Sequence, residues 1–154
     1  MLEKLPKSAF FHCKKFKVRH DIAALKVTTE ALVFGGFLAN QIKTEKDLLE
    51  IGTGCGLLSL MIAQKNQVFI DAVEINENAF ELAWENIQNS SFLNKIGVYH
   101  SSIQAFGISI APQDWNYYDL IFTNPPFFFF NFKGNDFEKN LAKHNDTLPF
   151  DELA

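Results

Sequence analysis

The fold of this chain is decided by the stretch Asp47-Leu48-Leu49-Glu50-Ile51-Gly52-Thr53-Gly54-Cys55-Gly56. Its first half is short and mostly apolar, which is typical of a buried strand, and its second half is a glycine-rich turn. The apolar run that follows, over residues 57–63, predicts a helix packed into the core. A strand, a tight turn and a helix in direct succession indicate the beginning of a parallel α/β unit.

The same alternation continues toward the C-terminus. Strands are predicted over residues 68–74, 96–99 and 118–123, and Asn76 is placed to cap a helix with apolar residues at helical spacing. Strands that are apolar on both sides and joined by helices indicate a parallel sheet with helices on both faces, in the Rossmann-like α/β class. In such sheets ligands bind beyond the carboxyl ends of the strands.

The N-terminal part adds a short basic segment and one helix. Residues 10–18 alternate loosely between apolar and polar, as in an edge strand or one arm of a hairpin. The segment Thr28-Thr29-Glu30 is placed to open a helix, with a threonine cap ahead of the apolar run 31–34. With 154 residues the chain is expected to form one domain, spanning 1–154. Because residues 148–154 read as the start of another helix, we expect the chain to be truncated at its C-terminus.

The composition excludes several classes of protein. Hydrophobic residues make up 47% and charged residues 21% of the chain, which predicts a packed core rather than disorder. No apolar run approaches the roughly 20 residues that span a bilayer. The two cysteines, Cys13 and Cys55, lack metal-ligand spacing and fit a reducing compartment. We therefore expect a cytoplasmic protein without a membrane segment, a disulfide framework or a metal ion, and a monomer is favoured.

The charge of the chain is distributed unevenly. The formal net charge is −4, yet residues 1–20 carry six Lys or Arg against one Glu, which leaves −9 for the remainder. Phenylalanines interleave with these basic residues, and such an edge can meet a phosphate backbone and unpaired bases. The same lysines can instead protect a solvated edge strand from aggregation. Both interpretations stay open.

The glycine loop itself predicts a ligand. Gly52, Gly54 and Gly56 let the backbone pass close to a bound molecule, although such turns also occur where chains simply pack tightly. The spacing G-x-G-x-G differs from the G-x-G-x-x-G of dinucleotide-binding folds. Glu50 would repel a pyrophosphate, whereas it suits a cationic sulfonium ligand with an amino-acid tail. These observations favour a nucleoside sulfonium as the cofactor and disfavour a nicotinamide-dependent oxidoreductase.

Two further positions border the same predicted cofactor site. Glu74 ends the second strand, roughly 20 residues beyond the glycines, where an acid can accept both ribose hydroxyls of a nucleoside. The alternative is an ordinary surface glutamate at a strand end. Ser102 lies in the segment 100–104, which we expect to be a loop that borders the adenine of the cofactor.

The sharpest motif is Asn124-Pro125-Pro126-Phe127, which breaks the last predicted strand beside the cofactor site. The Asn124 amide oxygen and the Pro125 carbonyl are both acceptors, so together they can bind the two hydrogens of an exocyclic amine. Such bonds orient the nitrogen lone pair toward a methyl donor, and Phe127 can stack on an extruded base. The alternative is a turn with an apolar plug. No role follows for the rest of the phenylalanine run or for His144.

Together these segments resemble class I methyltransferases of the N6-adenine type, and most closely the bacterial tRNA1(Val) (adenine(37)-N6)-methyltransferase family. The segments that carry the resemblance are residues 16–21, 25–30, 50–56, 71–74, 119–127 and 142–150. The resemblance implies that S-adenosyl-L-methionine is the methyl donor. It also implies that the acceptor is the N6 amino group of an adenine in tRNA, adenine 37 of tRNA1(Val).

The resemblance further implies roles for individual residues. Lys26 and Thr28, with Val27, would help to close the cofactor site. Contacts to the cofactor would come from Glu50, Gly52, Gly54 and Glu74, and the target base would be held by Asn124, Pro125, Pro126 and Phe127. In one departure, relatives commonly have aspartate where Ser102 stands. Because a neutral hydrogen bond is about half as strong as a charge-assisted one, we expect weaker cofactor binding.

Other functions remain as alternatives. The acceptor amine could be guanine N2 in ribosomal RNA or the glutamine side chain of a release factor. Glutamine enzymes of that kind carry a separate helical N-terminal domain, whereas only a short basic segment precedes the fold here. A non-catalytic nucleotide-binding or RNA-binding module is a rival from another class. The intact 124–127 turn close to an intact glycine loop disfavours that rival.

Overall fold

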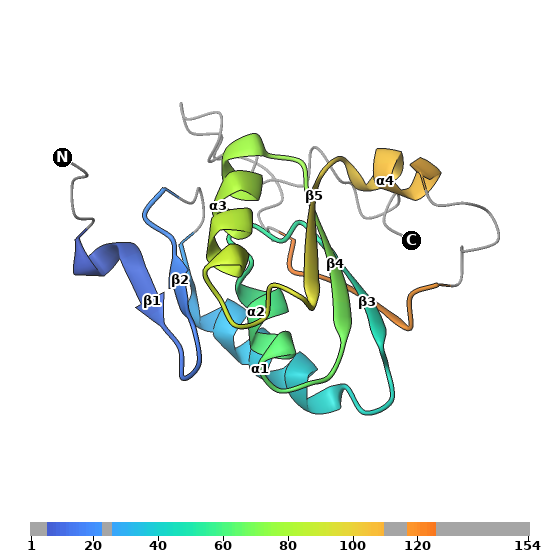
Figure 1. Cartoon of the computed structure of the whole chain (residues 1–154), viewed down its shortest axis with the longest axis horizontal. Helices are drawn as coiled ribbons and strands as arrows, with labels where there is room; N and C mark the ends of the chain where they lie inside the picture. The colour runs from blue at the N-terminus through green and yellow to red at the C-terminus, as the bar shows by residue number, and fades with distance from the viewer. Residues whose placement is uncertain (1–5, 23–25, 110–116, 126–154) are drawn as a thin grey trace, which may run out of the picture.

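A four-stranded parallel sheet forms the centre of the molecule. The computed structural model describes residues 6–22, 26–109 and 117–125. The strands are β3 (Asp47–Ile51), β4 (Phe69–Glu74), β5 (Ile96–His100) and β6 (Leu120–Thr123), arranged in the order β5-β4-β3-β6 (Figure 1). All three pairings are parallel. The strand bounds differ from the predicted ones by two residues at most.

Helices cover both faces of this sheet. On one face lie α1 (Thr29–Gln41), α2 (Leu57–Ala63) and α3 (Glu77–Gln88), and on the other lies α4 (Ile103–Ser109) (Figure 1). The larger core lies under the first three helices and includes Leu48, Leu60, Ile70 and Leu82. The smaller core lies under α4 and joins Leu49, Ile51 and Val73 to Phe106. The predicted Rossmann-like α/β class, with helices on both faces of a parallel sheet, is confirmed.

The two predicted helix caps are present. The Thr28 Oγ1 accepts the Ala31 N–H at 3.2 Å at the start of α1. The Asn76 Oδ1 accepts the Ala79 N–H at 2.9 Å at the start of α3. Each side chain satisfies a backbone donor that a helix end otherwise leaves unpaired, and this fixes where the helix begins.

Helices α1 and α2 pack together with their C-terminal ends adjacent. Asn66, just beyond α2, donates through Nδ2 to the Ala39 carbonyl near the end of α1 at 3.1 Å. Lys65 also donates to the side chain of Asn40. The N-terminal ends of the two helices therefore point to the same end of the sheet, where the glycine loop enters α2.

The N-terminal segment forms a separate hairpin. β1 (Phe10–His12) pairs antiparallel with β2 (Lys17–Arg19), and Val18 is fully buried in the larger core. The Lys15 Nζ donates to the Gln64 carbonyl at the end of α2 at 3.4 Å. The turn of the hairpin therefore lies near the amino ends of the strands, at the end of the sheet opposite the glycine loop.

Within the described part of the chain, two helical segments occur that the sequence analysis does not predict, a 3-10 helix over Lys7–Ala9 and α4. Residues 100–104 are expected to be a loop, but His100 is the last residue of β5 and α4 follows directly after Ser102. The Ser102 Oγ accepts the Ala105 N–H at 3.1 Å and so caps this helix. The loop prediction is wrong there because a helix of seven residues shows too little periodicity in the sequence.

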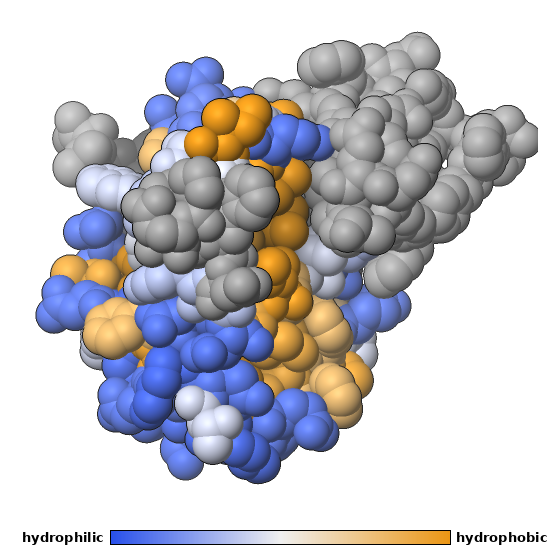
Figure 2. All heavy atoms as spheres, turned by 90° about the vertical axis from the view of Figure 1, so that its right-hand side faces the viewer, coloured by the Kyte–Doolittle hydropathy of each residue, from blue (hydrophilic) through white to orange (hydrophobic). Residues whose placement is uncertain are grey.

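Part of the surface is apolar. Figure 2 views the molecule from the right-hand side of Figure 1 and shows a strip of hydrophobic surface between hydrophilic regions. Ile121 of β6 is 56% exposed, and Val33 and Phe37 of α1 are 67% and 56% exposed. Within the described residues, no helix combines the length and the apolar character that crossing a membrane requires.

Candidate functional site

Three predicted segments meet at the carboxyl edge of the sheet. The glycine loop follows β3, Glu74 ends β4, and Asn124 follows β6. β3 lies between the other two strands, and Ile51 is paired with Thr123. The Thr123 Oγ1 also donates to the Ile51 carbonyl at 2.8 Å. Because neighbouring strands lie about 5 Å apart, the three segments share one edge within a ligand's reach.

The glycine loop is held by backbone hydrogen bonds. The N–H groups of Gly52 and Thr53 both donate to the Val73 carbonyl, at 2.8 and 3.2 Å, and the Gly56 N–H donates to the Thr53 carbonyl at 3.0 Å. The φ angles of Gly52, Gly54 and Gly56 are 71°, 60° and 79°. This left-handed conformation favours glycine at each of the three positions, which explains the alternating pattern.

The three glycines differ in what surrounds them. A Cβ placed on Gly52 or Gly54 would find no heavy atom within 4 Å, so both border open space. A Cβ on Gly56 would meet the Ile87 Cδ1 at 3.3 Å and the Ala83 Cα at 3.6 Å. Gly52 and Gly54 can therefore admit a ligand against the backbone. Gly56 instead lets α3 pack tightly against the loop, which was the alternative interpretation of the glycine turn.

Glu50 lies beneath the loop and is only 1% exposed. Its Oε2 accepts the Thr53 hydroxyl at 2.8 Å and also the Ser59 hydroxyl. Burial raises the pKa of Glu50 to about 7, although these two hydroxyl groups stabilise the carboxylate. The side chain ties the loop to the first turns of α2. It lies in the interior, so its charge can act on a ligand through the electric field rather than by contact.

Glu74 lies beside the open space over Gly54. Its Oε2 accepts the Gly54 N–H at 2.8 Å, its Oε1 accepts the Asn76 N–H at 2.9 Å, and the residue is 8% exposed. A carboxylate offers about four acceptor positions, so two further hydrogen bonds can be made. The structure thus leaves Glu74 with the capacity to accept a pair of hydroxyl groups.

Three further predicted residues lie on segments near the carboxyl edge of the sheet: Lys26 and Thr28 before α1, and Ser102 between β5 and α4. Lys26 is exposed and precedes α1, whose N-terminal end lies at the same end of the sheet as the glycine loop. Thr28 and Ser102 use their side-chain oxygens as helix caps. Ser102 is held close to the end of β4, because the Ser101 N–H donates to the Glu74 carbonyl at 3.0 Å.

Asn124 and Pro125 are half-buried and directly follow β6. Pro126 and Phe127 lie outside the described residues, as do the rest of the phenylalanine run and His144. Of the 124–127 turn, the structure therefore describes the two residues that carry the predicted acceptor groups.

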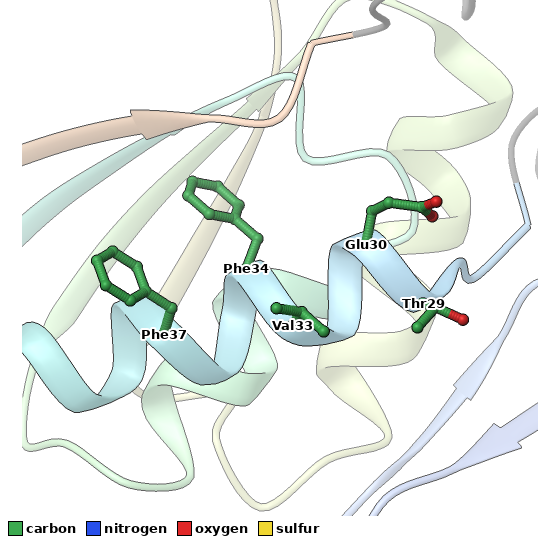
Figure 3. A pocket seen from close by; sticks show the side chains of 5 residues that line it. All are labelled: Thr29, Glu30, Val33, Phe34 and Phe37. Carbon is green, nitrogen blue, oxygen red and sulfur yellow. The ribbon is translucent and has the colours of Figure 1, made fainter.

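A groove of about 460 Å³ runs along α1 and is lined by Thr29, Glu30, Val33, Phe34 and Phe37. Figure 3 shows Phe34 and Phe37 extending from the same side of the helix. None of the five lining residues is among those predicted for the site. The groove begins at Thr29, next to the predicted residue Thr28, and extends from there along α1.

Among the described residues, sequence reasoning missed Thr53 and Ser59, whose hydroxyls hold Glu50, and also Asn86 on α3. Asn86 is 4% exposed and its side chain bonds to Arg19 of the hairpin and to Cys55 of the glycine loop. The only signal in the sequence is an asparagine between apolar positions of an amphipathic helix, which does not reveal its partners.

Comparison with known proteins identifies the family. Residues 28–144 match the family described as methyltransferase small domain. The chain belongs to the methyltransferase small domain family. The matched region includes every predicted site residue except Lys26 and Val27, which lie just before it.

Curated relatives of this methyltransferase small domain share a name. A protein from Dyadobacter fermentans, named tRNA1(Val) (adenine(37)-N6)-methyltransferase, is 42% identical over 150 residues, which are 97% of this chain and 59% of the relative. A protein of the same name from Parabacteroides distasonis is 39% identical over 144 residues, 94% of this chain and 58% of the relative. The chain thus spans about three fifths of the length of these relatives. The resemblance inferred from the motifs is confirmed.

A solved structure shares the fold. The S-adenosylmethionine-dependent methyltransferase from Agrobacterium tumefaciens matches with a TM-score of 0.62 and 19% identity, over 81% of this chain and 42% of that protein. At this identity the likeness concerns the fold of the methyltransferase small domain.

Proposed function

We propose that the protein carrying this chain transfers a methyl group from S-adenosyl-L-methionine to the N6 amino group of an adenine in tRNA, adenine 37 of tRNA1(Val). One observation carries the proposal: the open space over Gly54, the Glu74 carboxylate and Asn124 lie on three adjacent strand ends. The names of the relatives support the acceptor, because each of the two compared above is a tRNA1(Val) (adenine(37)-N6)-methyltransferase.

The residues of this edge fit the proposed donor. S-adenosyl-L-methionine supplies a methyl group on a cationic sulfonium. Gly52 and Gly54 leave room for it against the backbone, and Glu74 has acceptor capacity for the ribose hydroxyls. The ionised form of Glu50 would favour a cation above the loop. Gly56 would contribute by holding the loop against α3 rather than by contact.

The acceptor amine would be held by the turn after β6. The Asn124 amide oxygen and the Pro125 carbonyl would each accept one hydrogen of the amine, which aims the nitrogen lone pair toward the donor. These acceptors also stabilise the positive charge that develops on the nitrogen, so no strong general base is needed. In the proposal Pro126 stiffens the turn and Phe127 stacks on the extruded base.

The remaining predicted residues complete the proposed site. Lys26 and Thr28 would border the donor from the start of α1, and Ser102 would meet its adenine. Residues 1–154 would act as one domain, as a monomer and without a metal ion. A tRNA substrate would place the protein in the cytoplasm, where the free thiols of Cys13 and Cys55 are stable.

The test is to identify the methylated nucleoside. The whole protein is incubated with labelled S-adenosyl-L-methionine and, in separate reactions, with tRNA, ribosomal RNA or release factor, and the products are digested and identified by mass. We expect N6-methyladenosine from tRNA. Recovery of 2-methylguanosine or methylglutamine would replace the adenine assignment. Donor binding without any methylated product would support a non-catalytic nucleotide-binding module.

A further inference from the structure

Asn86 connects two parts of the chain that are far apart in sequence. Its Nδ2 donates to the Arg19 carbonyl and to the Cys55 carbonyl, each at 2.9 Å, and its Oδ1 accepts the Arg19 N–H at 2.7 Å. Both amide hydrogens and the amide oxygen are thus engaged, and the residue is 4% exposed. One side chain on α3 therefore holds β2 of the hairpin and the glycine loop at once.

The hydrogen bond from Asn86 to Cys55 holds the carbonyl of a peptide group whose N–H alone is bonded within the loop. The peptide between Cys55 and Gly56 donates its N–H to the Thr53 carbonyl at 3.0 Å, inside the loop. Its carbonyl is held by Asn86, which comes from outside the loop. Glycines before and after Cys55 give this backbone unusual freedom, so an external hydrogen bond limits the conformations that the loop can adopt.

A second contact joins the hairpin to the same turn of α3. The Arg19 Nη1 lies 2.9 Å from the Oε2 of Glu85, the residue before Asn86 in the chain. The Arg19 Nε also lies 2.8 Å from the Asp21 Oδ1 within the N-terminal segment. Gly56 also packs on this turn of α3, through Ala83. The hairpin, one turn of α3 and the glycine loop therefore form a connected unit.

We propose that Asn86 is a positioning residue, which sets the conformation of the glycine loop for donor binding and ties that conformation to the N-terminal hairpin. It acts through the Cys55 carbonyl and touches no reacting group. This role rests on the proposed function, because the loop is taken to bind S-adenosyl-L-methionine.

The variants are Asn86→Ala and Asn86→Asp, with Asn89→Ala as the matched control. Asn86→Ala removes all three hydrogen bonds, and Asn86→Asp sets an acceptor opposite two carbonyl oxygens. Asn89 lies just past the end of the same helix, is exposed and donates only locally, to the Glu85 carbonyl at 2.8 Å. The whole protein is used throughout, and S-adenosylhomocysteine is the probe for calorimetry without RNA.

We expect Asn86→Ala to bind S-adenosylhomocysteine about tenfold more weakly than the unchanged protein, or about 1.4 kcal/mol. The KM for the donor should rise by a similar factor, while kcat at saturating donor stays within about twofold. Asn86→Asp should bind still more weakly, and Asn89→Ala should bind as the unchanged protein does. A purely structural role would not divide KM from kcat in this way. Unchanged donor affinity in Asn86→Ala would overturn the proposal.

Amide hydrogen exchange tests the same contact without any donor. In Asn86→Ala the Gly56 amide should exchange faster, while the amide of Ala72 in β4 keeps its protection. Faster exchange at both amides to the same degree would show global destabilisation and overturn the proposal. If the unchanged protein binds no donor, the proposed function fails, and the exchange result still decides whether Asn86 positions the loop. If Asn86→Asp does not fold, Asn86→Ala alone decides.

Discussion

At the scale of single residues, Glu50 combines burial with a charge that the proposed function uses. The carboxyl group is 1% exposed and is held by the hydroxyls of Thr53 and Ser59. Burial disfavours its ionised form, which raises the pKa from 4.5 to about 7. Protein stability and donor affinity must therefore both depend on pH, with opposite signs.

The stability of the unchanged protein should fall as pH rises from about 4.5 to about 7. In this window the folded state binds a proton that the unfolded state has released, so each step up in pH favours unfolding. The full loss is on the order of 3 kcal/mol. Glu50→Gln keeps an acceptor oxygen for both hydroxyls and carries no charge, so it should lack this slope. Urea unfolding at a series of pH values gives the free energy of unfolding of both proteins. The same dependence on pH in both would contradict the prediction.

Donor affinity should follow the same titration in the opposite direction. Above pH 7 the ionised Glu50 attracts the cationic sulfonium, so binding of S-adenosyl-L-methionine should strengthen as pH rises through about 7. The Glu50→Gln variant has no titrating group at this position, and its donor affinity should change less over this range. Calorimetry with S-adenosyl-L-methionine at pH 6 to 8 measures this pH dependence of donor affinity for the unchanged protein and for Glu50→Gln.

Asn124 is the residue on which the acceptor side of the proposal depends. Asn124→Ala removes one of two proposed acceptors for the amine, so methyl transfer should be abolished while donor binding stays nearly intact. The paired measurements are nucleoside analysis after incubation with tRNA and calorimetry with S-adenosylhomocysteine. An equal loss of transfer and donor affinity would mean that the turn after β6 only supports the structure.

At the scale of secondary-structure elements, the contact between α1 and α2 depends on which of two adjacent glycines faces the partner helix. A Cβ on Gly35 would lie 2.7 Å from the Met61 Sδ and 3.0 Å from the Leu58 Cδ2, both on α2. A Cβ on Gly36 would find no heavy atom within 4 Å. Sequence alone treats the two positions alike, whereas packing separates them.

Alanine at these two positions should differ in its effect on stability. Gly36→Ala gains helix propensity and should stabilise the protein by roughly 0.5–1 kcal/mol. Gly35→Ala has the same gain, but it forces the ends of the Met61 and Leu58 side chains to move, so it should stabilise the protein less than Gly36→Ala does. Thermal unfolding of both variants gives the comparison. Equal stabilisation by the two substitutions would show that the helices separate easily.

What the sequence could predict at this scale follows from how local each cause is. Thr28 and Asn76 are recognisable caps because their hydrogen bonds reach only three residues along the chain. Asn86 is not recognisable, because its partners Arg19 and Cys55 lie 67 and 31 residues away. In the same way Gly54 and Gly56 look equivalent in the motif. Only the position of α3 shows that Gly56 packs against that helix, whereas Gly54 borders open space.

At the scale of the whole molecule, the charges of the basic N-terminal segment are less free than its composition indicates. Arg19 is paired with Asp21 and Glu85, and the Lys17 Nζ lies over the Phe10 ring at 4.8 Å from its centroid. The turn that carries Lys14 and Lys15 lies at the opposite end of the sheet from the glycine loop, as the Lys15 contact to α2 requires. An RNA whose target base enters at the carboxyl edge would therefore contact lysines near that edge before it reached Lys14 and Lys15.

Lys26 is exposed and lies just before the end of α1 that points toward the carboxyl edge, so it should contribute to tRNA binding more than the two lysines of the hairpin turn. Lys26→Gln is expected to weaken tRNA binding severalfold and to lower the salt dependence of log Kd by about 0.7–0.9, the value for one phosphate contact. The double variant Lys14→Gln, Lys15→Gln should change neither quantity. Filter binding at several salt concentrations measures both. The reverse result would mean that the hairpin side carries the RNA and that its lysines do more than protect an edge strand.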